Sequence, residues 1–323
     1  MEKLDLKDRK ILYNLDLDSR QSFRSIGRKV GLSKDVVASR VKRLQERGII
    51  KQFYSAIDSS KLGYTSFRFY LTFQRTNPEV VEEIIDYFVK NKFVWWVCRI
   101  KGRFDLGVAL WVKDIIDFDI FWEKTLQKFR YYFQDQVFSV YLQAITYKRS
   151  YILLDGYEKN DRLKFDVAGL GRKIETDNLD HQILESLAKN ARMPTMEIAE
   201  KLNSTAKTIN NRIQKLIKLN VIQGFRISID FSKLGYQFYK VDIKLMDYKK
   251  RGEMINYILM NPHLFAMNKT AGYADLELDF FVDNVDQLFQ IMEDLSVKFP
   301  NTIKNYTYFY EAEMYKWQYI PEE

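Results

Sequence analysis

The stretch that decides the fold reads FYSAIDSSKLGY at residues 53–64, and it returns as FRISIDFSKLGY at residues 225–236. The same offset of 172 residues aligns Asp8 with Asp180 without a gap, so the similarity is not confined to this segment. A period this long exceeds the roughly 20–50 residues of a solenoid repeat. It is domain-sized, and we therefore interpret the chain as a tandem duplication of one unit.

Length and composition limit the classes of protein to which the chain can belong. Its 323 residues leave room for about two to four domains. A single cysteine, Cys98, excludes an internal disulfide and a multi-thiolate metal site, and with only two histidines we expect no metal, no cofactor and no catalytic triad. The N-terminus is polar, and no apolar run of about 18 residues exists, so we expect a cytoplasmic protein without a membrane partner.

The positive charge is unevenly distributed between the two copies. The formal net charge is +8. Residues 1–51 contain 14 Lys or Arg against 7 Asp or Glu, whereas residues 175–223 contain 7 against 6. A basic patch is the electrostatic footprint of a nucleic-acid-binding surface. The opening segment of the first copy is therefore the best candidate for such a surface.

The opening segment has the pattern of a helix-turn-helix. Apolar spacing predicts helices over residues 8–16 and 22–30, and Ser33 is a good N-cap for a third helix over about 34–47. Residues 49–57 then alternate like a strand. Three helices followed by a strand predict a winged helix-turn-helix domain.

After residue 64 the pattern changes to alternating strands and helices. We predict strands over 66–74, 93–101, 106–112 and 137–149, and helices over 78–90 and about 117–131. The order βαββαβ is the ferredoxin-like arrangement. The same order follows in the second copy, but at an offset of 170, so two residues have been lost in its first strand–helix–strand stretch. The predicted fold class is α+β, with two winged helix-turn-helix domains alternating with two ferredoxin-like domains.

In order and spacing, these motifs resemble the Lrp/AsnC, or feast/famine, transcription regulators. Residues 32–44, followed by 48–50, look like the recognition helix of that family, and residues 4–12 resemble its first helix. Gly102-x-x-Asp105 falls where the family has a hairpin in its effector domain. The resemblance implies a sequence-specific DNA-binding regulator that responds to amino acids or small metabolites. Because the family normally has one such unit per chain, the fused pair implies a covalent pseudo-dimer.

We expect five segments on this basis. They are a DNA-binding domain over 1–63, an effector domain over 64–153, a linker over 154–178, a second DNA-binding domain over 179–235 and a second effector domain over 236–323. The partners implied are double-stranded DNA, a small-molecule effector such as an amino acid, and further copies through the effector domains.

The candidate DNA contacts lie on the outward faces of the predicted helices. In the first copy they are Lys34, Ser39, Lys42 and Arg43, with Arg24, Arg28 and Lys51 as supporting phosphate contacts. In the second copy they are Lys207, Asn210, Asn211 and Lys215, where the amides can pair with adenine. The alternative is a charged face that is merely solvated. The repeated Arg40 and Arg212 are expected instead to pair with Asp8 and Asp180.

The effector site is expected near the two hairpins. By position its residues would be Gly102, Asp105, Gly272 and Asp275, although Gly and Asp also favour tight turns for structural reasons. Two rival functions remain. One is an enzyme that resembles the sirohaem decarboxylases, but His181 and His263 form no His-rich cluster in the sequence, so we do not expect an enzyme. The other is a DNA-binding-deficient oligomerisation partner.

Overall fold

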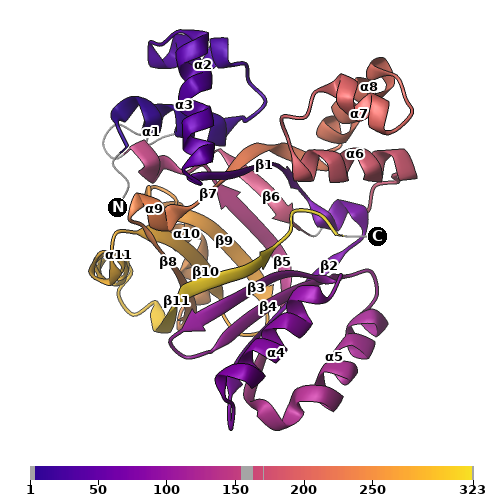
Figure 1. Cartoon of the computed structure of the whole chain (residues 1–323). Helices are drawn as coiled ribbons and strands as arrows, with labels where there is room; N and C mark the ends of the chain where they lie inside the picture. Colours follow the sequence, from indigo (N-terminus) through magenta and orange to yellow (C-terminus); the bar gives the residue numbers. More distant parts are fainter. Residues whose placement is uncertain (1–3, 154–162, 170, 322–323) are drawn as a thin grey trace.

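Each copy begins with three short helices that form a compact head. The computed structural model describes residues 4–153, 163–169 and 171–321. The helices are α1 (Leu6–Leu17), α2 (Phe23–Val30) and α3 (Lys34–Glu46) in the first head, and α6 (Asn178–Lys189), α7 (Thr195–Lys201) and α8 (Ala206–Lys218) in the second. Both heads stand on the same end of a shared sheet structure (Figure 1). The three-helix prediction is confirmed in both copies.

The strand after each third helix differs from a conventional wing. β1 (Ile50–Ile57) does not fold back onto its own head; it pairs antiparallel with β7 (Ile222–Ile229) of the other copy. Phe53 lies opposite Ile227 in this two-stranded ribbon. The predicted wing is therefore shared between the copies. Apolar side chains from both strands, Phe53 and Ile227 among them, lie in one buried cluster with the first head.

The ferredoxin-like prediction is confirmed in both copies. The first copy contains β2 (Thr65–Phe73), α4 (Pro78–Lys90), β3 (Val94–Lys101), β4 (Leu106–Val112), α5 (Ile115–Phe129) and β5 (Phe133–Tyr147). The second contains β8 (Gln237–Leu245), α10 (Arg251–Ile258), β9 (Leu264–Ala271), β10 (Leu276–Val282), α11 (Val285–Lys298) and β11 (Ile303–Trp317). α10 is shorter than α4, and the offset between the copies changes from 172 to 170 between the strands that flank these helices. α5 and β5 begin a few residues earlier than predicted.

Short elements connect these parts. They are η1 (Ser59–Leu62), η2 (Arg130–Tyr132), η3 (Ser150–Leu153), β6 (Lys164–Ala168), α9 (Phe231–Leu234) and η4 (Tyr248–Lys250). β6 falls inside the segment predicted as a linker and pairs with the end of β5, so this part of the connection is docked on the sheet. Residues 154–162 and 170 of that segment lie outside the described residues.

The two ferredoxin-like sheets close into one barrel. The strand order is β2-β4-β3-β11-β8-β10-β9-β5, and β2 also pairs with β5, which completes the ring. The two copies meet at the seams β3–β11 and β5–β9, where Cys98 lies opposite Met314 and Ile145 opposite Met267. The covalent pseudo-dimer expected from the sequence is therefore confirmed: both halves of the barrel come from one chain.

Apolar layers hold the helices to the outside of the barrel. α4 and α5 pack on the first half through residues such as Phe69, Phe88 and Phe121, all nearly inaccessible to solvent. α10 and α11 cover the second half in the same way around Val241 and Leu288. No helix within the described ranges is long and apolar enough to cross a bilayer.

Candidate nucleic-acid interface

Helix α3 presents a polar face to solvent and an apolar face to its head. Val37 and Val41 are buried, whereas Lys34, Ser39 and Lys42 are exposed. The hydroxyl of the N-cap residue accepts a hydrogen bond from the Val36 amide at 3.3 Å, as the sequence predicted for Ser33. The exposed face therefore carries donors of the kind that reach base edges and phosphates.

The predicted pairing of the third helix with the first is confirmed. Arg40 Nη1 lies 2.8 Å from Oδ1 of Asp8, a carboxylate that is almost completely buried. Arg43 shares the same carboxylate, because its Nη2 donates to both oxygens at 3.0 Å. Arg43 was predicted as a DNA contact. In the structure its half-exposed guanidinium connects α3 to α1 through Asp8, and its DNA contact remains a prediction.

The supporting cations of the first head are accessible but differ in their surroundings. Arg24 and Arg28 are exposed on α2. Lys51, at the start of β1, is also exposed, yet its Nζ lies 3.4 Å from Oδ2 of Asp230 in the other copy. The charge of Lys51 is therefore partly neutralised, whereas neither arginine forms an ion pair within residues 4–153, 163–169 and 171–321.

The second head repeats this architecture with fewer free charges. Lys207, Asn210 and Asn211 are exposed on α8. Lys215 is exposed too, but its Nζ lies 3.9 Å from the buried Asp180 carboxylate. Arg212 pairs with Asp180 at 3.1 Å, which confirms the second predicted contact between a third helix and a first helix.

A reciprocal pair of arginines joins the two heads. Arg20 Nη1 donates to the Ala191 carbonyl at 2.6 Å, and Arg192 Nη1 donates to the carbonyls of Ser19 and Gln21, the latter at 3.1 Å. Burial lowers the pKa of both guanidiniums, and the neighbouring charge of Arg20 lowers the pKa of Arg192 further. We call this pair the arginine clasp. Sequence reasoning assigned it no role, although both arginines recur at the repeat offset.

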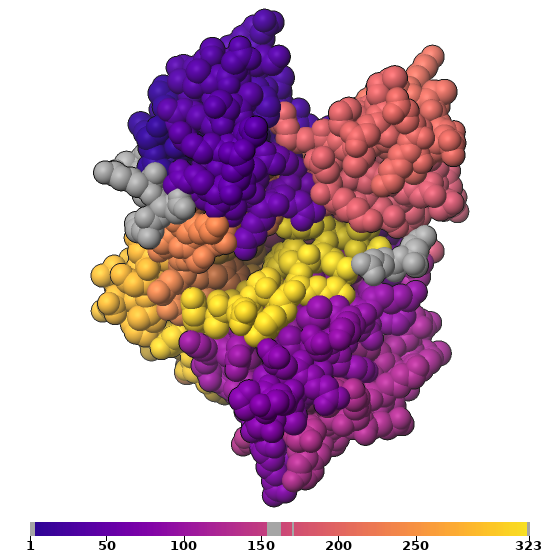
Figure 2. Space-filling view, in the orientation of Figure 1, coloured from indigo at the N-terminus to yellow at the C-terminus, as the bar shows by residue number. Residues whose placement is uncertain are grey.

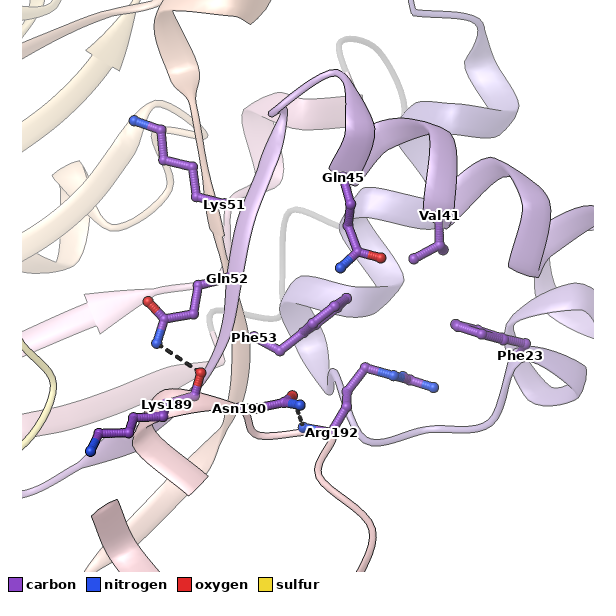
Figure 3. Close-up of a pocket in the computed structure, with 9 residues that line it drawn as sticks. All are labelled: Phe23, Val41, Gln45, Lys51, Gln52, Phe53, Lys189, Asn190 and Arg192. Carbon is purple, nitrogen blue, oxygen red and sulfur yellow. Dashed lines mark hydrogen bonds between the residues drawn. The ribbon is translucent and has the colours of Figure 1, made fainter. Parts of the chain in front are cut away.

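A cavity of about 380 Å³ opens beside the clasp, between the heads. A cleft separates the heads in the space-filling view (Figure 2). Phe23, Phe53 and Arg192 point toward one another in the cavity, whereas Lys51 and Lys189 extend away from them (Figure 3). The guanidinium of Arg192 lies 4.4 Å from the ring centre of Phe23. Because that guanidinium already binds two carbonyls, the cavity offers no free cation at its centre.

Comparisons with known proteins identify the heads and the unit to which they belong. The AsnC-type helix-turn-helix domain matches residues 4–45 and 177–217. An uncharacterised HTH-type transcriptional regulator of Pyrococcus furiosus is 36% identical over 103 residues, which cover 32% of this chain and 70% of that protein. The chain belongs to the Lrp/AsnC family of transcription regulators. HTH-type transcriptional regulator Ptr1 of Methanocaldococcus jannaschii is 35% identical over 112 residues, covering 35% of this chain and 74% of Ptr1.

The fold of the whole chain resembles that of a further protein. The siroheme decarboxylase NirDL superimposes with a TM-score of 0.66, covering 98% of this chain and 94% of NirDL, at 14% identity. Identity this low shows the fold alone, whereas the relatives that are similar in sequence are Lrp/AsnC regulators. The function is therefore that of a DNA-binding regulator, and the decarboxylase alternative is not supported.

The surroundings of the two histidines agree with a structural role for both. His263 Nδ1 lies 2.8 Å from the Phe281 carbonyl, and its Nε2 lies 3.1 Å from the side-chain nitrogen of Gln287. Burial lowers the pKa of His263, which keeps the ring neutral. His181 lies on α6 of the second head, where its Nε2 contacts the Thr176 hydroxyl at 2.9 Å. Both rings are already engaged within the fold.

The four residues predicted near an effector lie in two hairpins that abut the facing sheet. Asp105 accepts a hydrogen bond from the Phe73 amide at 2.7 Å, and Asp275 accepts one from the Leu245 amide at 2.8 Å. Gly272 has φ +138°, and a Cβ there would lie 2.5 Å from a backbone oxygen of the first copy. Gly102 has the same conformation, with φ +140°. These residues shape the turns, and an effector role for them remains a prediction.

Proposed function

We propose that this Lrp/AsnC regulator binds double-stranded DNA through both heads at once, with the first head supplying most of the electrostatic affinity. The observation that carries the proposal is the face of α3, where Lys34 and Lys42 are exposed on a capped helix whose opposite side is buried. Among the residues that the structure describes, Lys34 forms no ion pair, and the ion pair of Lys42 is a solvent-exposed contact with Glu46 at 3.8 Å, which contributes little to stability.

The second head is proposed to contribute less charge and more direct reading of bases. Asn210 and Asn211 are exposed on α8, and asparagine can pair bidentately with adenine in the major groove. The two heads therefore differ in chemistry although they share a fold. Such a pair is suited to an operator whose half-sites differ in sequence.

The test is a salt-controlled binding assay on DNA captured from the genome by the purified protein. We expect Lys34→Ala/Lys42→Ala to reduce the slope of log K against log salt by about 2, because each lost phosphate contact removes about 0.9 from that slope. We expect Lys207→Ala/Lys215→Ala to reduce it by less. Lys298→Ala, on α11 of the barrel, is the matched control. Equal losses from the two heads would refute the asymmetry, and no loss from either would refute the proposed interface.

A small-molecule effector is a second part of the proposal and rests on family membership. Its residues would be those of the hairpins, and Asp105→Asn is the variant that tests them. Addition of an amino-acid mixture is expected to change the affinity of the wild-type protein for its captured DNA. An unchanged affinity would remove the effector from the proposal.

Association between chains is also proposed, but through the outer faces of the effector domains. The eight strands of the barrel are all paired within one chain. Ile115, Ile116 and Ile120 of α5 are 62%, 62% and 49% exposed, so this helix offers an apolar surface for such contacts. Light scattering of wild-type protein and an Ile116→Glu variant tests this point.

A further inference from the structure

A cluster of charged side chains crosses the barrel interior from one copy to the other. Arg68 on β2 donates to both carboxylate oxygens of Glu277 on β10, at 2.7 and 2.6 Å, and both side chains are inaccessible to solvent. Lys240 on β8 lies 2.9 Å from Glu277 and 3.1 Å from Asp279. Planar bidentate pairs of this kind are among the stronger and more directional charge pairs. The first copy therefore supplies a cation to a carboxylate of the second.

The charges in this cluster are not distributed equally between the copies. At the repeat offsets Arg68 corresponds to Lys240, so each copy contributes one cation. The carboxylates come from one copy alone: Asp242, Glu277, Asp279 and Glu311 correspond to Tyr70, Gly107, Ala109 and Tyr141. Among the described residues these acids do not converge as ligands of a metal ion. Thr270 and Asn268 donate to Glu277 and Asp279, and the Cys98 thiol donates to Glu311, but the cations that face this group of acids are Arg68 and Lys240.

A second buried site, beneath the heads, shows the same asymmetry. Asp16 of the first copy accepts hydrogen bonds from Arg226 of the second at 2.8–3.1 Å, and both are fully buried. Arg149 of the first copy also contacts this carboxylate through its side chain and through its amide, the latter at 2.9 Å. The three corresponding residues are Ala188, Tyr54 and Tyr319. The two tyrosine rings stack with centres 3.7 Å apart, and Tyr54 lies opposite Arg226 in the β1–β7 ribbon, so these positions adjoin the charged site but supply no charge of their own.

We propose that the two copies are complementary units, each of which pairs with the other and neither with itself. A pair of first copies would bury two Arg68 side chains with no carboxylate between them. A pair of second copies would bury eight carboxyl groups, among them two copies each of Glu277 and Asp279, with two lysines, and would place each Arg226 opposite an alanine. Uncompensated buried charges are strongly unfavourable, so like pairs are rejected by the same groups that stabilise the unlike pair.

Complementarity of this kind has a consequence for how the protein is assembled. Every barrel must contain one first copy and one second copy, whether they belong to the same chain or to exchanged chains. Each barrel therefore presents one basic head and one amide-rich head. The arginine clasp makes no such distinction, because Arg20 and Arg192 correspond to each other at the repeat offset.

The first test uses the full chain with a protease recognition sequence inserted between Glu158 and Lys159. The cleaved protein is unfolded, refolded and weighed by native mass spectrometry, without DNA, so the result does not depend on the proposed function. We expect unlike pairs to exceed like pairs by more than about a hundredfold, the factor that corresponds to one unpaired buried charge. Like and unlike pairs in statistical proportion would overturn the proposal. Arg20→Ala/Arg192→Ala, which removes the symmetric clasp, is the control and should leave the proportions unchanged.

The second test does not require the fragments to refold. It is a double-mutant cycle on the intact chain with Arg68→Met, Glu277→Met and the double variant, measured by denaturant unfolding. Each single change should lower the folding equilibrium constant by about a hundredfold or more. The loss in the double variant should be at least about tenfold smaller than the product of the two single losses. A coupling below about twofold would show that charge pairing does not select the partner.

Discussion

Replacing Asp16 is the most informative single perturbation of this protein. Its carboxylate is bonded by Arg226 Nη2 at 2.8 Å and by the Arg149 amide at 2.9 Å, and all three residues are almost inaccessible to solvent. Asp16→Ala leaves two buried guanidiniums without a carboxylate. Breaking a buried pair in this way costs about 3–5 kcal/mol, a large share of the roughly 5–15 kcal/mol that holds a typical domain together.

The corresponding residues of the repeat suggest the rescue. Ala188, Tyr54 and Tyr319 occupy the corresponding positions and supply no charge of their own, so Asp16→Ala/Arg149→Tyr/Arg226→Tyr introduces the residue types that the fold already accommodates there. Replacement of a buried ion cluster by well-packed apolar groups is often close to neutral. We expect the triple variant to regain at least half of the stability that the single variant loses.

The assay is equilibrium unfolding in guanidinium at pH 7, followed by circular dichroism and tryptophan fluorescence. Coincidence of the two probes establishes two-state behaviour, which the free energies require. A loss below about 1 kcal/mol for Asp16→Ala, or a triple variant no more stable than the single one, would refute the reasoning about this site.

The same site has a defined pH dependence. Burial by itself would raise the pKa of Asp16, but the guanidiniums of Arg149 and Arg226 outweigh it and hold the pKa below the ordinary value of 3.8. A lowered pKa contributes stability above the unfolded-state pKa and loses it as pH falls through the folded-state pKa. The difference between wild type and Asp16→Ala should therefore be constant from pH 5 to 8 and shrink below about pH 4. A difference that grew in acid would contradict this assignment.

Three further predictions concern separate parts of the molecule. Burial, reinforced by neighbouring carboxylates, raises the pKa of Asp242 from 3.8 to about 7, so its contribution to stability should decline between about pH 4 and 7 and then level off; Asp242→Asn should flatten this part of a stability–pH profile. Ser33→Ala removes a helix cap and should lower the free energy of unfolding by about 1 kcal/mol. In this variant, amide exchange should become faster at the start of α3 and stay unchanged in α8. Gly107→Ala would place a Cβ 2.4 Å from the ring of Trp96 and should cost about 1–3 kcal/mol, whereas Gly252→Ala, with nothing within 4 Å, should stabilise by about 0.5–1 kcal/mol; equal melting temperatures would contradict both.

Much of the local structure was predictable because it depends on short sequence patterns. The heads follow from helical apolar spacing and from a cap residue such as Ser33, whose contact lies three residues away. The pairing of Arg40 with Asp8 was predictable for a different reason, since Arg212 and Asp180 repeat the same combination. The exposed face of α3 was predictable because the apolar spacing identifies the buried face and leaves the remaining positions to solvent. Its DNA contacts remain predictions, because exposure shows what is accessible and not what binds.

The remaining features depend on which strands and side chains meet across the two copies. Every strand edge offers the same backbone donors and acceptors, whatever its side chains. The sequence of β1 therefore did not show that it pairs with β7 of the other copy and not within its own head as a wing. The partners Arg68 and Glu277 are 209 residues apart and share no local period. For the same reason the clasp by Arg20 and Arg192 was visible only as a repeat and not as a contact.

Two Lrp/AsnC-like units with unequal surface charge can be recognised from the sequence alone. Helical periods and charge counts depend on residues close together along the chain, and a repeat is found by aligning the chain with itself, so none of these requires knowledge of the fold. The closure of the two sheets into one barrel and the complementarity of their buried charges are visible only in the folded structure. Burial is the physical reason. A carboxylate and a guanidinium become decisive for pairing only when water is excluded from both, and the sequence alone does not show where that happens.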